Sequence, residues 1–205
     1  MMGRSCSGWP DRPLVVKLGG SLLDVLDGIV GEIRGIGGPL LVVPGGGPFA
    51  DRVREQDLDD DAAHWMAIDA MDRTGRLIRD AGLPAVGRLS VPHHPAVLLP
   101  GRILREHDPL PHCWEVTSDT IAAWVARTLG AELVLLKSVD GIRVEGRLVR
   151  YLGAPCSTDV VDPCLIPFVL SNDIPATILN GRVPGRLRAF CSGAGPAGTR
   201  IDTRF

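Results

Sequence analysis

Short apolar runs alternate with longer amphipathic segments along the whole chain. Apolar runs bounded by Gly and Pro are typical of buried strands, whereas apolar positions three and four apart are typical of helices. The pattern therefore predicts strands at residues 14–18, 39–44, 85–91, 96–100, 131–139 and 175–180. Helices are predicted at residues 21–36, 48–56, 61–81, 118–130, 157–172 and 183–192.

Turn signals refine several of these elements. Ser21 is a candidate cap for the helix over 21–36, and Pro184 is a helix-start signal for the helix over 183–192. Pro163 and Pro167 predict a late start or kinks in the helix over 157–172. Residues 142–152 alternate around Glu145-Gly146 and predict a hairpin, and the tail after residue 197 is expected to add an edge strand.

Strands that alternate with helices predict an α/β fold, with a mainly parallel sheet covered on both faces. We expect a flexible lead-in over residues 1–12 and a single domain over 13–205, because no linker divides the chain. Ligands of such sheets bind beyond the carboxyl ends of the strands. The glycine clusters of this sequence lie at those ends, so the site is expected there.

Composition excludes several classes of protein. The net charge is −2, which argues against a nucleic-acid binder, and no apolar run is long enough to span a bilayer. The first residues have no apolar core and do not resemble a secretory signal. The five cysteines form no CxxC pair, which argues against a disulfide framework and favours a reducing cytoplasm.

Lysine is scarce, and both lysines lie near strand ends. Of 22 basic residues, only Lys17 and Lys137 are lysines. Lys17 is followed by Gly19-Gly20 and by the predicted helix start at Ser21. Glycine amides at a helix start can hold an anion, and a nearby lysine can neutralise a phosphoryl group. The alternatives are an ordinary tight turn for the glycines and a surface position for Lys137.

A second glycine cluster, Gly45, Gly46 and Gly47, follows the strand at 39–44. Three consecutive glycines cost backbone entropy, so close approach of a ligand explains them better than chance does. Neither a Walker A loop nor a dinucleotide fingerprint is present. We therefore predict two neighbouring anion sites of a different kind.

Three further groups of residues are candidates. Ser118 and Asp119 are the first residues of the helix predicted over 118–130. Asp119 is a candidate to orient the lysines or a Mg²⁺ ion. The alternative is that an acidic residue is present there only because the helix dipole stabilises it. Two predicted turns also follow strands, namely Asp140-Gly141 and Asn180-Gly181-Arg182. Arg182 is a candidate phosphate ligand. The five histidines show no metal-ligand spacing.

Taken in order, these motifs resemble the amino acid kinase superfamily. The resemblance rests on K-x-G-G-S, G-G-G, S-D-T-x-A-A, V-D-G-I and N-G-x-x-P-G, and it extends over about residues 13–202. Further segments resemble kinases of methanofuran biosynthesis, namely PGGGPFADRVR, AHWMAIDAMDRTG, LLPGRIL, HCWEVTSDTIAAW and ILNGRVPGRL. The resemblance implies a three-layer αβα sandwich, ATP with Mg²⁺ as donor, a homodimer and a phosphorylated small-molecule acceptor.

The resemblance also implies roles for individual residues. Lys17 would stabilise the transferred phosphoryl group, and Asp119 would organise Lys17 and Lys137. The nucleotide or its phosphates would lie on the side of residues 116–205, with Gly19, Gly20, Ser21, Ser118, Asp140, Gly141, Asn180, Gly181 and Arg182. The acceptor would lie on the side of residues 13–115, with Gly45, Gly46, Gly47, His64 and Trp114.

The implied reaction is direct in-line transfer from ATP to (5-(aminomethyl)furan-3-yl)methyl phosphate or a related C1-carrier cofactor precursor. Two alternatives remain open. One is a non-catalytic protein of the same fold that binds a nucleotide or an oxyanion. The other is a kinase for a different acceptor, such as an isoprenoid phosphate or an amino acid.

Overall fold

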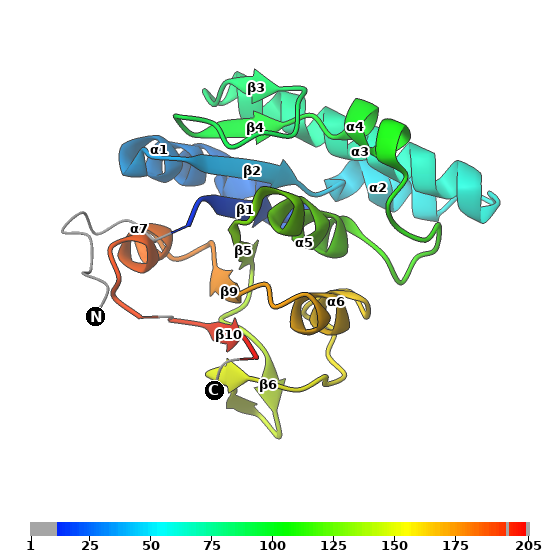
Figure 1. The fold of residues 1–205 in the computed structure, drawn as a ribbon. Helices are drawn as coiled ribbons and strands as arrows, with labels where there is room; N and C mark the ends of the chain where they lie inside the picture. The colour runs from blue at the N-terminus through cyan, green and yellow to red at the C-terminus, as the bar shows by residue number, and fades with distance from the viewer. Residues whose placement is uncertain (1–11, 196, 204–205) are drawn as a thin grey trace.

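The computed structural model describes residues 12–195 and 197–203, which form an eight-stranded sheet with helices on both faces (Figure 1). All neighbouring strands are parallel except β9 and β10. The predicted α/β class is therefore confirmed. In spatial order, the strands are β3 (Ala85–Val86), β4 (Ala96–Leu98), β2 (Leu40–Pro44), β1 (Leu14–Leu18), β5 (Glu132–Lys137), β9 (Ala176–Asn180), β10 (Thr199–Ile201) and β8 (Tyr151–Leu152).

The most apolar runs of the sequence form the centre of the sheet. β1 lies between β2 and β5, and every residue of β1 and β2 is buried. Because the chain first crosses from β1 to β2 and only later returns to the other side of β1 at β5, the strand order reverses at β1. A sheet of this kind has its ligand crevice at the carboxyl ends of the strands beside such a reversal.

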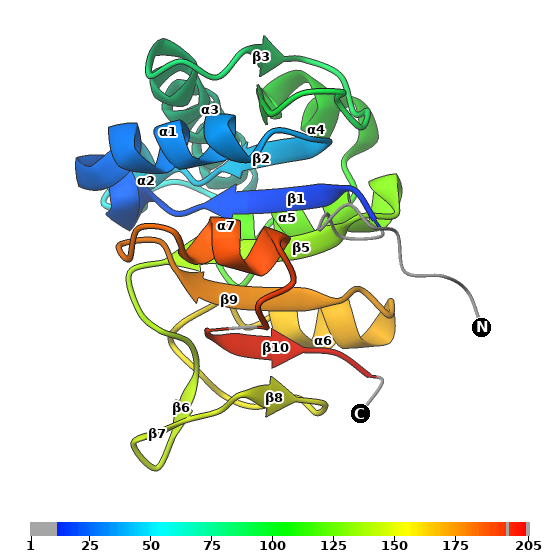
Figure 2. The same ribbon diagram turned by 90° about the vertical axis from the view of Figure 1, so that its left-hand side faces the viewer.

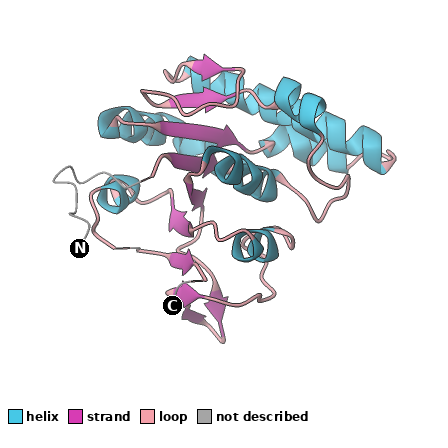
Figure 3. Ribbon diagram, in the orientation of Figure 1, coloured by secondary structure: helices cyan, strands magenta, loops and turns pink. Residues whose placement is uncertain are grey.

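Helices cover the two faces of the sheet separately. Figures 1 and 2 show α1 (Leu26–Ile36) and α7 (Arg186–Cys191) on one face, and α5 (Ser118–Leu129) and α6 (Leu165–Ser171) on the other. Two further helices, α2 (Gly47–Arg54) and α3 (Asp60–Asp80), pack together beside β2, and α4 (Gly101–His107) packs on α3. The helical and strand layers are distinguished by colour in Figure 3.

Each face has its own apolar core because successive strand residues point to opposite sides. Val15 and Leu133 belong to the core under α5 and α6. Val16 and Val134, the next residues along the same strands, belong to the core under α1 and α7. The predicted sandwich therefore follows directly from continuous apolar strands that are buried on both faces.

Some predicted helix starts are wrong. Ser21 does not cap a helix: the turn after Gly19 is a 3-10 helix, η1 (Gly20–Val25), closed by a bond from the Leu22 amide to the Gly19 carbonyl, and its N-cap has no side-chain bond. α7 begins at Arg186 rather than at Pro184, because Gly185 has a left-handed φ of 82°. The start of α5 at Ser118 and the late start of α6 are as expected, and α2 and α3 each begin within one residue of the prediction.

Two strand predictions also need correction. The strand expected over 85–91 stops at Val86, ahead of a segment that contains Gly87 and Pro92. The tail strand is not at the edge, because β10 lies between β9 and β8. The predicted hairpin is present as β6 (Arg143–Val144) and β7 (Arg147–Leu148), a separate two-stranded sheet.

Two further findings concern the described residues only. Within 12–195 and 197–203, no helix combines the length and the apolar character needed to cross a membrane. Cys113, Cys156, Cys164 and Cys191 are free thiols. Cys6 and all but one residue of the expected lead-in over 1–12 lie outside the described part of the chain.

Candidate active site

Two lysines from different strands meet at one buried aspartate. Lys17 is the fourth residue of β1, and Lys137 is the last residue of β5. Asp119 lies in the first turn of α5, which places its carboxylate above the carboxyl ends of these strands. The Lys17 Nζ lies 2.8 Å from Asp119 Oδ1, and the Lys137 Nζ donates to Asp119 Oδ2 at 2.6 Å. We call these three residues the lysine–aspartate trio.

The trio is buried, which strengthens its electrostatics. Lys17 and Asp119 are only 5% and 3% exposed. Burial alone would raise the pKa of Asp119, but Lys17 and Lys137 outweigh it and lower that pKa. Burial and the neighbouring Lys17 lower the pKa of Lys137, against the opposing effect of Asp119. With both lysines protonated, the trio carries one net positive charge in a site of low polarity, which favours an anion.

A second aspartate, which the sequence analysis missed, positions Asp119. The carboxylate of Asp162 accepts bonds from the backbone amides and hydroxyls of Thr117 and Thr120 at the start of α5. It also accepts a bond from the Leu165 amide at the start of α6. The Asp162 amide donates to Asp119 Oδ2 at 3.3 Å. The one signal for it in the sequence is an Asp-Pro pair just before an apolar helical run.

The two glycine clusters pack directly against each other. A Cβ added to Gly20 would lie 2.1 Å from the Gly47 Cα, so no side chain fits between the two turns. A Cβ on Gly45 would lie 3.3 Å from the Ser118 Oγ and from the Gly20 nitrogen. The glycines thus let the ends of β1, β2 and α5 converge beside the trio.

Two of the expected amide donors are already used inside the fold. The Gly19 amide donates to the Leu136 carbonyl at 3.4 Å, and the Gly45 amide donates to the Leu18 carbonyl at 2.8 Å. Gly20 and Gly47 each open a helix, where first-turn amides have no helical carbonyl partner. The donors that remain for an anion are therefore those of Gly20, Ser21, Gly46 and Gly47, rather than all five glycines.

The turns after β5 and β9 form a second polar group. Asp140 Oδ1 accepts bonds from Asn180 Nδ2 at 3.1 Å and from Arg186 Nη1 at 2.6 Å, and both bonds lower the pKa of Asp140. Gly141 has φ 142° and packs against Thr199, and Gly181 packs against Leu22. The structure thus gathers Asp140, Asn180 and Arg186, of which Arg186 was not predicted.

The guanidinium of Arg182 is bound by Asp24 and is not free to contact the group formed by Asp140, Asn180 and Arg186. Its two terminal nitrogens bond to the carboxylate of Asp24 at 2.8 and 2.9 Å, and one of them also bonds to the Ser21 carbonyl. The fork that was expected to hold a phosphate is therefore filled by Asp24 in this structure.

A pocket adjoins the trio on the side of α2 and α3. Gly46, Thr117 and Ser118 line it where it meets the trio, and His64 and Trp114 line it farther out. The remaining wall is mainly apolar and includes Ala50, Ala63, Ala67, Ile68, Met71, Val116 and Ile121. The guanidinium of Arg54 lies 4.4 Å from the centre of the Trp114 ring, a cation–π contact that also places a positive charge at this pocket.

The fold and this site together define a class of protein, an α/β phosphotransferase. Comparison with known proteins supports this class. Residues 12–95 match the model of the amino acid kinase family. The [5-(aminomethyl)furan-3-yl]methyl phosphate kinase of Methanocaldococcus jannaschii is 28% identical over an alignment 211 residues long, which covers 91% of this chain and 96% of the relative.

Solved structures agree on the fold. Uridylate kinase from Archaeoglobus fulgidus superposes with a TM-score of 0.70 at 19% identity, over 92% of this chain and 99% of that chain. UMP kinase from Bacillus anthracis superposes with a TM-score of 0.74 at 18% identity, over 95% and 97% of the two chains. The matches to the family model and to the Methanocaldococcus jannaschii relative support a phosphotransferase related to the amino acid kinases.

Proposed function

We propose that this protein transfers the γ-phosphoryl group of ATP to the phosphate of a small acceptor. The acceptor we propose is [5-(aminomethyl)furan-3-yl]methyl phosphate or a related C1-carrier cofactor precursor. The observation that carries the proposal is the trio of Lys17, Asp119 and Lys137, buried beside an apolar and aromatic pocket. The acceptor class is supported by the relative that is 28% identical over nearly the whole of both chains.

The chemistry of a phosphate acceptor suits this site. A phosphate monoester has its second pKa near ~6, so it is largely a dianion at pH 7 and needs no general base. An oxygen of that phosphate attacks the γ-phosphorus, the bond from the γ-phosphorus to the bridging oxygen breaks, and ADP leaves with that oxygen. Lys17 and Lys137 would offset the charge that donor and acceptor bring together.

The nucleotide would occupy the side of residues 116–205, near Asp140, Asn180 and the amides that open η1. Both oxygens of Asp119 already contact a lysine, so the trio offers no free carboxylate to a metal ion. Mg²⁺ would therefore enter on the phosphate oxygens of ATP, the way it commonly binds in kinases. There it would neutralise phosphate charge, while the residues of the chain orient the two substrates.

The acceptor would occupy the pocket between the trio and Trp114. We expect Trp114→Ala to raise KM for the acceptor about 10-fold to 100-fold, because it removes a ring that lines the pocket and contacts Arg54. KM for ATP should change little. Steady-state kinetics with each substrate varied in turn measure both constants. Trp124→Phe, at a buried position of α5 outside the pocket, is the control; an unchanged acceptor KM in Trp114→Ala would contradict this placement.

The lowered pKa of Lys137 predicts an alkaline limit to activity. Because burial and Lys17 lower this pKa, the ammonium loses its proton below the ordinary lysine value of 10.5. The site then loses positive charge, so kcat/KM should fall as the pH rises toward that value. An arginine at position 137 keeps its charge at every accessible pH, so Lys137→Arg should not show this alkaline decrease in kcat/KM. Its rate at pH 7 should be lower than that of the wild type. Identical alkaline profiles in the two proteins would assign the decrease to another group.

The experiment that tests the proposed function is ADP release with Mg-ATP and a panel of acceptors, run beside Lys17→Ala. The panel contains the furan phosphate, the corresponding furan alcohol, isopentenyl phosphate and UMP. Turnover with the furan phosphate that disappears in Lys17→Ala supports the proposal. Faster turnover with another phosphate would identify that compound as the better acceptor. ATP binding without turnover on any acceptor would favour a non-catalytic binding protein.

A further inference from the structure

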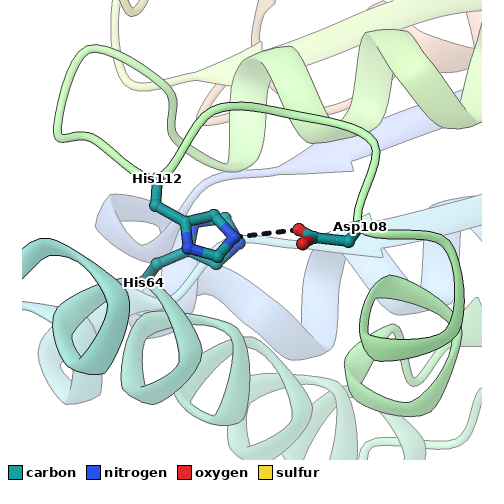
Figure 4. A group of neighbouring side chains, drawn as sticks. All are labelled: His64, Asp108 and His112. Carbon is teal, nitrogen blue, oxygen red and sulfur yellow. Dashed lines mark hydrogen bonds and ion pairs between the residues drawn. The ribbon is translucent and has the colours of Figure 1, made fainter.

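Two histidines and an aspartate converge at the outer wall of the pocket. His64 comes from α3, Asp108 from the end of α4, and His112 from the loop between α4 and α5. One nitrogen of each ring and one oxygen of Asp108 all lie within 4.8 Å of one another. Figure 4 shows the two rings one over the other with the Asp108 carboxylate beside them; their centres are 3.8 Å apart and their planes differ by 17°.

We propose that His64, Asp108 and His112 bind one divalent transition-metal ion of the Zn²⁺ type. Two imidazoles and a carboxylate are a ligand set that suits Zn²⁺ and Co²⁺ rather than Mg²⁺, which prefers oxygen. Three protein ligands leave a fourth position for water or a ligand group. The spacing of these residues along the chain does not indicate a metal site, because His64 lies in α3 and the other two ligands lie more than forty residues later.

A second carboxylate orients one of the ligands. His112 Nδ1 lies 2.5 Å from Asp61 Oδ1, and His112 Nε2 lies 2.8 Å from Asp108 Oδ1. If Nδ1 donates its proton to Asp61, Nε2 is left to face Asp108 and the ion. Metal-bound histidines commonly donate their other ring N–H to a carboxylate in this way. The ion would replace the direct contact between His112 Nε2 and Asp108 Oδ1.

The ion would connect two parts of the pocket wall. His64 is itself a lining residue, and His112 precedes Cys113 and Trp114, which line the same pocket. Trp65 packs edge-on against both histidine rings, at 4.9 and 5.1 Å between ring centres. A bound ion would therefore link the loop between α4 and α5 to α3 and restrict the movement of Trp114 in the pocket wall.

The experiment titrates the chelator-treated, desalted full chain with Co²⁺ and with Zn²⁺, following binding by calorimetry and Co²⁺ absorption. We expect saturation at one ion per chain. His64→Ala and His112→Ala should each weaken binding by more than 10-fold, and Asp61→Asn by about 10-fold to 100-fold. Zn²⁺ at about 100 times its Kd should raise the Tm of the wild type by roughly 5 to 10 °C, and not that of His112→Ala.

Two variants make the result decisive. His93→Ala combined with His94→Ala removes an exposed histidine pair in another loop and should leave binding unchanged, which separates the site from surface histidines. Asp108→Asn retains the left-handed backbone at φ 41°, which Asn tolerates, and should still weaken binding in a folded protein. The proposal is overturned if the wild type binds no ion saturably, or if binding survives in both His64→Ala and His112→Ala. In that case His112 is held only by its ion pairs with Asp61 and Asp108.

Discussion

Replacing Lys17 by alanine is expected to lower kcat about 1,000-fold while the protein remains folded. Lys17 supplies one of the two ammonium groups of the trio, and removal of one preorganised charge from such a site costs about 10²-fold to 10³-fold or more. Asp119 keeps Lys137 as a partner at 2.6 Å, so its carboxylate is not left without a cation. The measurement is steady-state ADP release, with circular dichroism to verify the fold.

The matched control is Arg127→Ala, which removes one positive charge from the exposed last turn of α5. Its kcat should stay within about twofold of the wild type, because exposed charges at this distance are screened by solvent and salt. Lys17→Arg is a second informative variant. A Cβ on Gly19 would already lie 3.6 Å from the Lys17 ammonium, so the site is too crowded for a planar guanidinium to replace it well. If Lys17→Ala retained the kcat of the wild type, the role assigned to Lys17 in phosphoryl transfer would be wrong.

Replacing Gly20 by alanine is expected to destabilise the protein by about 3 kcal/mol or more. The new Cβ would lie 2.1 Å from the Cα of Gly47, so the backbones of the two glycine turns would have to separate. For a chain of this size the loss corresponds to a fall in Tm of roughly 6 to 12 °C. At temperatures where the variant is still folded, its kcat should also fall, because the same separation moves α2 away from the trio.

Gly28→Ala is the control for this substitution. Gly28 lies in α1, and a Cβ added there meets nothing within 4 Å. Alanine is the better helix former, so we expect stabilisation of about 0.5 to 1 kcal/mol. Thermal unfolding of the two variants beside the wild type measures both effects. Equal Tm values for Gly20→Ala and the wild type would show that the glycine turns do not depend on their close contact.

Local pattern was enough to predict the centre of the fold and its most polar residues. Lys17 is the last but one residue of an apolar strand and Lys137 is the last residue of another, and parallel strands bring their carboxyl ends to one edge. Asp119 follows a helix-start signal whose cap, Thr117, is seen in the structure. Sequence pattern placed these residues at the same edge, but it could not give the distances that unite them.

Features that depend on distant partners were not predictable. The bonds between Asp162 and the start of α5 join residues more than forty positions apart, and the ion pair of Arg182 with Asp24 spans most of the chain. The use of the Gly19 and Gly45 amides inside the fold depends on strand pairing. The position of β10 between β9 and β8 likewise depends on pairing order, which the sequence of a three-residue strand does not encode.

The most direct test of the central claim follows the phosphorus atoms of the reaction. The wild-type protein is incubated with Mg-ATP and [5-(aminomethyl)furan-3-yl]methyl phosphate, and ³¹P NMR identifies the products. The account predicts a new diphosphate of the furan compound in an amount equal to the ADP formed, and no such product with the furan alcohol or with Lys17→Ala. Release of inorganic phosphate alone, or no ADP from a folded protein that binds ATP, would contradict it.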